Sequence, residues 1–496
     1  MPSTKSENVN FATTDPDLQT LLTDFDDIFT GLGKFEQEYR IELRPEAVPV
    51  QVRPRKVPLS MKSDLIKTIL ELEQRQIITK VEAPTDWISH LQPVRKPNEK
   101  IRICIDPQNL NQAIKRNHAV MPTLEDVLPQ LNGAKFFSLC DAKEGFYQIP
   151  LAEESTDLTT FWTPIGKYKY LRLPFGIASA PEEFQRRLTE NLAGLDGITI
   201  VADDILIFGR TRKEHDRNLE ALFKGARQTG LRLNKEKSRF LQDELPYIGH
   251  ILTTNGLKPD PNKVNAILKM KPPSPPQGVK RFLGHITYMS KFISNLASES
   301  EPLRRLLTQD NARDFHWTDD QMNAFNRLKT LLTDSETLQY FDCNKPVTIQ
   351  TDASNAGVDA TLMQGGKPVA YASRSLTKSE QNYVPLELEC LAIVFGIERF
   401  DQYIFGHHAV TIQTDHKPLV SIFRKSIHKA SRRLQAMLLH LQRYPNIKVT
   451  WQKGAEQITA DLLSRDSYFD SQLSTTTRKH FFTLTLKIMM LLFVTT

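Results

Sequence analysis

A pair of adjacent carboxylates between two apolar runs constrains this chain more than any other feature. The segment GITIVADDILIFG (197–209) places β-branched and aliphatic residues on both sides of Ala202, Asp203 and Asp204. Such runs around a short turn predict a β-hairpin with the two aspartates at its tip. Two like charges about 4 Å apart repel by roughly 4 kcal/mol at an effective dielectric near 20. Most Asp-Asp turns are solvated and purely structural, so a cation site is indicated only if further acids lie close to this pair.

A third carboxylate lies earlier in the chain. Asp141 ends the apolar run KFFSLCD (135–141), which is a second predicted strand. Three carboxylates from two neighbouring strand ends could hold two divalent ions about 3.5–4 Å apart, and Mg²⁺ prefers carboxylate and phosphate oxygens. In-line phosphoryl transfer needs this arrangement, since one ion activates the attacking hydroxyl and the other neutralises the leaving group.

Several motifs in order resemble the reverse transcriptases of gypsy-type LTR retrotransposons. The resemblance is collinear from about residue 46 to 335. Its motifs are RICIDPQNLN (102–111), FSLCDAKEGFYQI (137–149), LPFGIASAPEEFQ (173–185), VADD (201–204), YIGH (247–250) and RFLGHITYMSKFI (281–293).

The resemblance implies a role for each matching residue. Asp141, Asp203 and Asp204 match the metal-binding triad. Phe146 matches the steric gate that excludes a ribose 2′-hydroxyl, although a plain core position is the alternative. The basic residues expected to grip the incoming triphosphate are Arg95 and Arg102, and those expected to form the primer grip are Tyr247, Ile248 and Gly249. Relatives often carry a large residue near position 202, where this chain has alanine.

Four acids downstream form a second candidate site. Each one alone is most often solvated or a helix cap, but their segments resemble the RNase H domain of the same elements over about 343–466. The resemblance implies four ligands of a two-metal ribonuclease, namely Asp352, Glu389, Asp415 and Asp461. Many such enzymes carry a histidine shortly before the last acid, where this chain has WQKG (451–454). The basic stretch FRKSIHKASRR (423–433) is either a solvated loop or a grip on hybrid phosphates.

The fold class implied by the resemblance is an α+β polymerase with fingers, palm and thumb, followed by an α/β RNase H-like domain. We expect a lead-in over 1–45, fingers and palm over 46–255, a thumb over 256–340, RNase H over 343–466, and an unmatched apolar tail over 467–496. The proline-rich stretch KMKPPSPPQG (269–278) predicts a domain edge. Neither an Asp-Ser/Thr-Gly protease motif nor a His-His-Cys-Cys integrase pattern occurs, so we expect a fragment of a polyprotein. The tail is short and interrupted by Lys487, which favours a non-native end over a membrane anchor.

Composition agrees with this organisation without proving it. The 496 residues exceed one hydrophobic core, and 40% hydrophobic with 25% charged residues is typical of soluble globular proteins. A net charge of +6 fits nucleic-acid binding but is shared by many enzymes. The four cysteines are far apart and form no CxxC pair, which predicts buried, reduced thiols.

We therefore expect an RNA-directed DNA polymerase and ribonuclease H that uses Mg²⁺, two ions per active site, with Mn²⁺ as the alternative ion. The expected partners are an RNA template, a DNA primer, RNA–DNA hybrids and dNTPs, with no membrane partner and an open oligomeric state. The polar N-terminus indicates no signal peptide, so the expected location is cytoplasmic, in the virus-like particle of an intact element. The alternatives are an inactive or co-opted nucleic-acid-binding remnant and a cellular two-metal nuclease, but the latter does not explain Asp141, Phe146 and the hairpin.

Overall fold

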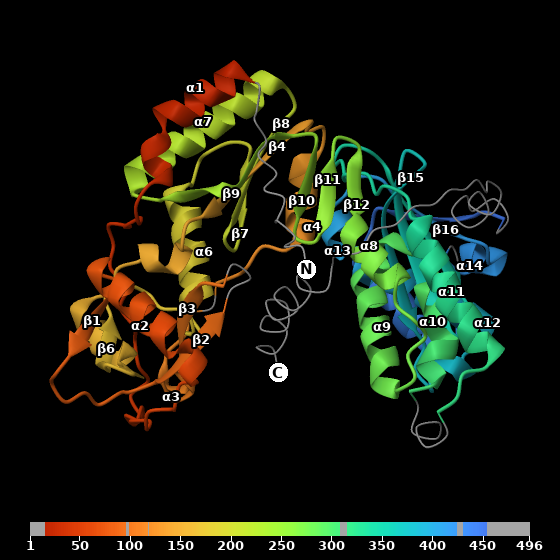
Figure 1. Cartoon of the computed structure of the whole chain (residues 1–496). Helices are drawn as coiled ribbons and strands as arrows, with labels where there is room; N and C mark the ends of the chain where they lie inside the picture. The colour runs from red at the N-terminus through yellow and green to blue at the C-terminus, as the bar shows by residue number, and fades with distance from the viewer. Residues whose placement is uncertain (1–14, 96–98, 118, 308–314, 424–429, 454–496) are drawn as a thin grey trace, which may run out of the picture. The chain divides into compact units, whose positions relative to one another are not determined.

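The computed structural model describes residues 15–95, 99–117, 119–307, 315–423 and 430–453, and its helices and strands are labelled in Figure 1. The chain divides into two compact units. The first unit is built from the chain up to Val127 and from Ala134–Asp243, and the second from Leu128–Gly133 and from Glu244 onward.

The first unit is centred on an antiparallel sheet of order β7-β8-β4-β9. These strands are β7 (Ile198–Val201), β8 (Asp204–Gly209), β4 (Phe136–Ala142) and β9 (Leu233–Gln242). The predicted hairpin is therefore β7–β8. Helix α7 (Arg212–Thr229) follows the hairpin. It begins where the Thr211 side chain accepts from the Glu214 N–H and ends at Gly230, whose φ is +76°.

Smaller elements complete the first unit. Two sheets, β1 (Ile78–Val81) with β6 (Gly166–Tyr170) and β5 (Phe161–Thr163), and β2 (His90–Arg95) with β3 (Ile101–Asp106), share one core with the main sheet. The helices are α2 (Leu59–Gln74), α3 (Gln108–Ala113), α4 (Leu124–Val127), α5 (Glu153–Thr156) and α6 (Ala180–Asn191).

The lead-in contains structure that the sequence did not predict. Helix α1 (Pro16–Asp24) buries Leu18 and Leu22, and Asp15 forms a 2.6 Å ion pair with Arg212 of α7. Phe25, directly after α1, packs its ring 5.6 Å from that of Phe223. Residues 15–45 therefore belong to the core of the first unit.

The second unit begins with a three-stranded meander and four helices. The strands are β10 (Glu244–Tyr247), β11 (His250–Thr253) and β12 (Gly256–Pro259), and the helices are α8 (Pro261–Leu268), α9 (Pro276–Tyr288), α10 (Leu296–Arg305) and α11 (Asp319–Thr333). Phe282 and Phe325 join α9 to α11 with ring centroids 4.5 Å apart. The proline-rich stretch lies inside this unit, where it links α8 to α9, so it does not mark an edge between the two units.

A mixed five-stranded sheet of order β15-β14-β13-β16-β17 forms the rest of the second unit. Its strands are β13 (Val347–Ala353), β14 (Gly357–Gln364), β15 (Lys367–Ser375), β16 (Val410–Thr414) and β17 (Ile447–Trp451), with helices α12 (Pro385–Arg399), α13 (Asp401–Ile404), α14 (Lys417–Ile422) and α15 (Arg432–Leu441). Helix α12 packs closely on one face, because a Cβ at Gly396 would lie 3.0 Å from Ala360 and 3.3 Å from Ile349.

Helix α10 packs on the opposite face of this sheet. A Cβ at Gly357 would lie only 2.4 Å from the Cβ of Ala297. The Ala297 N–H donates to the Ser373 hydroxyl at 2.7 Å, and the hydroxyls of Ser298 and Ser354 share a 2.8 Å hydrogen bond. Because side chains alternate along a strand, Gly357 and Ala360 face opposite sides of β14. The sheet is thus covered by α12 on one side and by α10 on the other.

Two further expectations concern thiols and membranes. All four cysteines are free. Cys140 and Cys390 are buried, Cys104 is partly buried and Cys343 is exposed, so the prediction of burial is wrong for Cys343 and only partly met at Cys104. No helix among the described residues is both long and apolar enough to cross a bilayer. The predicted apolar tail lies outside the described residues.

Candidate active sites

The main sheet of the first unit brings its three acids together. The antiparallel register of β4 and β8 places Asp141 directly opposite Asp204. Asp203 occupies the turn between β7 and β8, where its carbonyl accepts a 3.3 Å hydrogen bond from the Ala142 N–H. Directly opposed residues have Cβ atoms about 4.5–5.5 Å apart, so strand pairing brings Asp141 and Asp204 close together, and Asp203 is next to Asp204 in the chain.

A glutamine holds the tip of this hairpin. Ala202 has φ of +56°, a conformation that favours glycine, and with Asp203 it forms a two-residue turn between paired Val201 and Asp204. The Ala202 N–H donates to Oε1 of the buried Gln185 at 2.7 Å, and Nε2 of Gln185 donates to the Ile200 carbonyl at 3.1 Å. Gln185 therefore fixes the backbone that carries the two aspartates.

A lysine that the sequence did not single out contacts the third acid. Lys237 of β9 places its Nζ 3.3 Å and 3.4 Å from the two carboxylate oxygens of Asp141. The Ser238 hydroxyl accepts from the Asp141 N–H at 3.4 Å. This position on a neighbouring strand depends on long-range pairing, so no local motif could have indicated it.

The predicted nucleotide-binding residues separate into two groups. The Arg102 guanidinium lies 4.7 Å from the centroid of the Phe175 ring, and Phe146 packs against the same ring at 4.9 Å. Phe146 lies in the 3-10 turn after β4, and Phe184 also contacts it at 5.8 Å. Arg95, in contrast, pairs with Glu99 at 2.7 Å. Because Arg102 lies opposite Val94, Arg95 points to the other face of this small sheet.

The predicted primer grip is the turn between β10 and β11. Ile248 and Gly249 have φ of +42° and +71°, which is the two-residue type I′ geometry of tight hairpins. The Ile248 carbonyl accepts from the Tyr288 hydroxyl at 3.0 Å, and Lys263 Nζ donates to that hydroxyl at 2.9 Å. A Cβ at Gly249 would lie 1.8 Å from Lys263 Nζ, and the φ of +71° strains any residue with a side chain, so glycine is favoured here. Tyr247 is buried, which leaves the turn itself as the accessible part.

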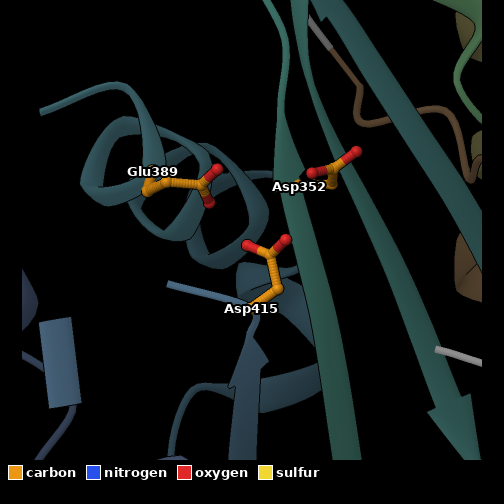
Figure 2. Close-up of side chains that lie close together, drawn as sticks. All are labelled: Asp352, Glu389 and Asp415. Atoms are coloured by element: carbon orange, nitrogen blue, oxygen red, sulfur yellow. The ribbon is translucent and has the colours of Figure 1, made fainter. Parts of the chain in front are cut away.

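The mixed sheet of the second unit assembles the other acids. Strands β13 and β16 are parallel with Gln350 opposite Gln413, so Asp352 and Asp415 follow at the same edge. Figure 2 shows their carboxylates together with that of Glu389, which comes from α12. One oxygen from each of the three lies within 4.8 Å of the others. Among the described residues, no other group of three acids meets this limit, and Asp141, Asp203 and Asp204 do not meet it.

The charges of this cluster are strongly coupled. Burial raises the pKa of Glu389 to about 8, and the carboxylates of Asp415 and Asp352 add to the effect. Burial and Asp415 also raise the pKa of Asp352. The Glu389 Oε2 atom is buried and has no hydrogen-bond partner. Clustered carboxylates with an unsatisfied buried oxygen fit a divalent cation, because such an ion stabilises the charged forms and occupies the vacant lone pair.

The fourth predicted acid and part of the basic stretch 423–433 lie beyond what the structure describes. Asp461 lies outside the described residues, as do Arg424, Lys425 and Lys429 of the basic stretch. Arg433 is engaged in a 2.7 Å ion pair with Glu387. Where relatives often carry a histidine, the Trp451 indole N–H donates to the Asp415 carbonyl at 3.0 Å. Trp451 thus steadies the end of β16, a role that the sequence did not indicate.

Comparisons with known proteins match both domains. Residues 94–252 match the family model described as reverse transcriptase (RNA-dependent DNA polymerase), and residues 342–444 match the RNase H-like domain found in reverse transcriptase. A foamy viral protease-reverse transcriptase solved in complex with dsDNA superposes with a TM-score of 0.80 at 21% identity, over 90% of this chain and 96% of that one. A second structure, with an RNA/DNA hybrid, gives 0.75 at 20% identity over 93% and 62%. The fold and the two acid clusters therefore define a reverse transcriptase domain followed by an RNase H-like domain.

Curated relatives match a larger share of the chain than either family model. The retrovirus-related Pol polyprotein from transposon opus of Drosophila melanogaster is 32% identical over 92% of this chain, and that from transposon 412 is 33% identical over 90%. The corresponding protein from transposon gypsy is 33% identical over 75% of the chain. The chain is therefore a homologue of these retrotransposon Pol polyproteins over most of its length. It spans 48% of the opus protein and 37% of each of the other two.

Proposed function

We propose that this chain copies RNA and then DNA into DNA from dNTPs, and that it degrades the RNA strand of the resulting hybrid. The observation that carries the proposal is that acids far apart in sequence come together in both units. Asp141 lies opposite Asp204 on paired strands, and one carboxylate oxygen from each of Asp352, Glu389 and Asp415 lies within 4.8 Å of the others. Both reactions are phosphoryl transfers, in which positioning and charge stabilisation account for most of the catalysis.

Each site has residues suited to a pair of divalent ions. In the polymerase site these are Asp141, Asp203 and Asp204, and in the ribonuclease site they are Asp352, Glu389 and Asp415, with Asp461 as the expected fourth. When bound, Mg²⁺, or Mn²⁺ as the alternative, would supply activation of the attacking oxygen and neutralisation of the leaving group.

The remaining residues of the polymerase site position the substrates. Arg102 is held over the face of Phe175, so its planar guanidinium is fixed for bidentate contact with a triphosphate. Phe146 rests on the same ring, where its partly exposed edge could limit the space beside the sugar. The Ile248–Gly249 turn would offer backbone groups to the primer strand, since the adjacent Tyr247 ring is buried.

A reciprocal pair of variants tests the proposal on the full chain. Primer extension on an RNA template with Mg²⁺ measures the polymerase, and cleavage of a labelled RNA–DNA hybrid measures the ribonuclease. Asp203→Asn is expected to reduce extension by about a hundredfold or more while hybrid cleavage continues, because it removes charge stabilisation from one site only. Asp352→Asn is expected to do the reverse.

Asp196→Asn is the matched control, because Asp196 is exposed in the turn before β7 and outside both clusters. It should retain both activities. A wild-type chain that binds template without extending it would instead support the inactive, nucleic-acid-binding alternative.

A further inference from the structure

A fifth carboxylate lies beside the candidate ribonuclease site. Asp359 is in strand β14, and the antiparallel register places it directly opposite Asp352 of β13. Opposed residues project to the same face with Cβ atoms about 4.5–5.5 Å apart. Asp359 is only 6% exposed. The sequence offered no signal for it, since a single acid within a strand usually points to solvent.

The surroundings of Asp359 satisfy only half of its carboxylate. The Ser373 hydroxyl, opposite it on β15, hydrogen-bonds to Asp359 and itself accepts the Ala297 N–H at 2.7 Å. The other oxygen, Oδ1, is buried and has no hydrogen-bond partner. No lysine or arginine in the described part of the chain forms an ion pair with Asp359. An unpaired buried carboxylate is costly, and the neighbouring charge of Asp352 adds repulsion.

A cation at the neighbouring site would relieve both costs. Asp359 does not belong to the group of oxygens within 4.8 Å that Asp352, Glu389 and Asp415 form. It therefore lies beyond Asp352, as an outer charge and not as one more member of that group. Carboxylates that surround metal ligands orient them and strengthen their negative potential, and their loss typically costs about 10–100-fold in metal affinity.

We propose that Asp359 is a positioning residue of the ribonuclease metal site, which acts through Asp352 to raise the affinity for a divalent cation. The inference rests on the proposed ribonuclease function. It also explains why an acid is placed under α10, where a neutral side chain would be cheaper to bury.

Calorimetric titration of the full chain with Mn²⁺ alone tests this role without an activity measurement. An Asp203→Asn background removes binding by the polymerase site, and the heat that disappears on adding Asp352→Asn defines binding at the ribonuclease site. In this background Asp359→Asn is expected to weaken that binding by about 10–100-fold. Ser373→Ala is the matched control, because it removes the neighbouring hydrogen bond but retains the carboxylate, and its Mn²⁺ affinity should stay within about twofold of wild type.

Thermal melting of the same variants separates this role from a purely structural one. Asp359→Asn should melt higher than wild type in EDTA, because the unpaired charge is gone, and should gain less stability from Mn²⁺. Unchanged Mn²⁺ affinity in Asp359→Asn would overturn the inference, and so would a variant that folds poorly in EDTA. If the wild-type chain shows no Asp352-dependent binding at all, the proposed ribonuclease site itself fails.

Discussion

Glu389 should make the metal-free RNase H-like domain less stable as the pH rises. Its pKa is raised from 4.5 to about 8 by burial and by the charges of Asp415 and Asp352. The folded domain therefore holds a proton that the unfolded chain releases near pH 4.5. This contribution to stability is complete below pH 4.5 and is lost as the pH rises towards 8. Each pH unit between the two pKa values lowers the free energy of unfolding by about 1.4 kcal/mol, so the whole loss is about 5 kcal/mol.

Glu389→Gln is expected to remove this dependence, because a neutral amide has no proton to lose. Hydrogen exchange of peptides from β13 and α12, followed by mass spectrometry in EDTA and corrected for intrinsic rates, reports the stability of this domain alone. The wild-type protection should fall between pH 5 and 8, whereas that of Glu389→Gln should stay nearly level between pH 7 and 8. Asp359, with a pKa of about 6, titrates lower, so the slope between pH 7 and 8 belongs mainly to Glu389.

Metal binding gives a second measurement of the same proton. A cation that binds the ionised carboxylate must displace the proton, so about one proton should be released at pH 7 and fewer as the pH approaches 9. Calorimetry in two buffers with different ionisation enthalpies measures this number. A wild-type domain whose protection is constant from pH 5 to 8, or a Glu389→Gln variant with the wild-type slope, would refute the reasoning.

Three other predictions concern the polymerase. Tyr288→Phe removes the hydroxyl that donates to the Ile248 carbonyl, so it should slow single-turnover extension by about tenfold without changing hybrid cleavage. The control is Tyr340→Phe, which loses a similar 2.9 Å hydrogen bond to the Thr253 carbonyl, away from the turn, and should leave the extension rate unchanged. Gln185→Met leaves two backbone groups of the hairpin tip without their partner and should lower the extension rate by about 10–100-fold, while the affinity for primer–template stays within about threefold. Burial lowers the pKa of His215 below 6.5, so the unfolded chain takes up a proton before the folded one as the pH falls, and the folded state loses stability. The hydrogen-exchange protection of α7 peptides should therefore drop below pH 6.5 in the wild type and remain level in His215→Gln.

Local pattern was sufficient wherever a feature depends on neighbouring residues in the chain. The apolar runs around Asp203 predicted the hairpin, because turn preferences act over a few residues. The resemblance then supplied which acids to group. The described acids of each predicted set lie on paired strands or on the helix packed against them.

Features that depend on strand register were not predictable in this way. Lys237 contacts Asp141 only because β9 pairs with β4, and Asp359 lies beside Asp352 only because β14 pairs with β13. Helix α1 was missed because its short apolar pattern gains stability mainly from packing on α7. Trp451 was interpreted as the loss of a histidine, yet its indole hydrogen-bonds to the backbone of Asp415.

The packing of helix α10 on the five-stranded sheet determines where the chain can be cut to isolate the RNase H-like domain. Helix α10 falls within the predicted thumb (256–340), but Ala297 in its first turn contacts β14 and β15, and Ser298 hydrogen-bonds to Ser354 in the turn before β14. A fragment that starts at residue 343 would therefore expose the sheet face that carries Gly357, Ser373 and Asp359 to water. Proteolysis or truncation that aims to isolate the ribonuclease should cut before Leu296, since α10 shields this face from solvent.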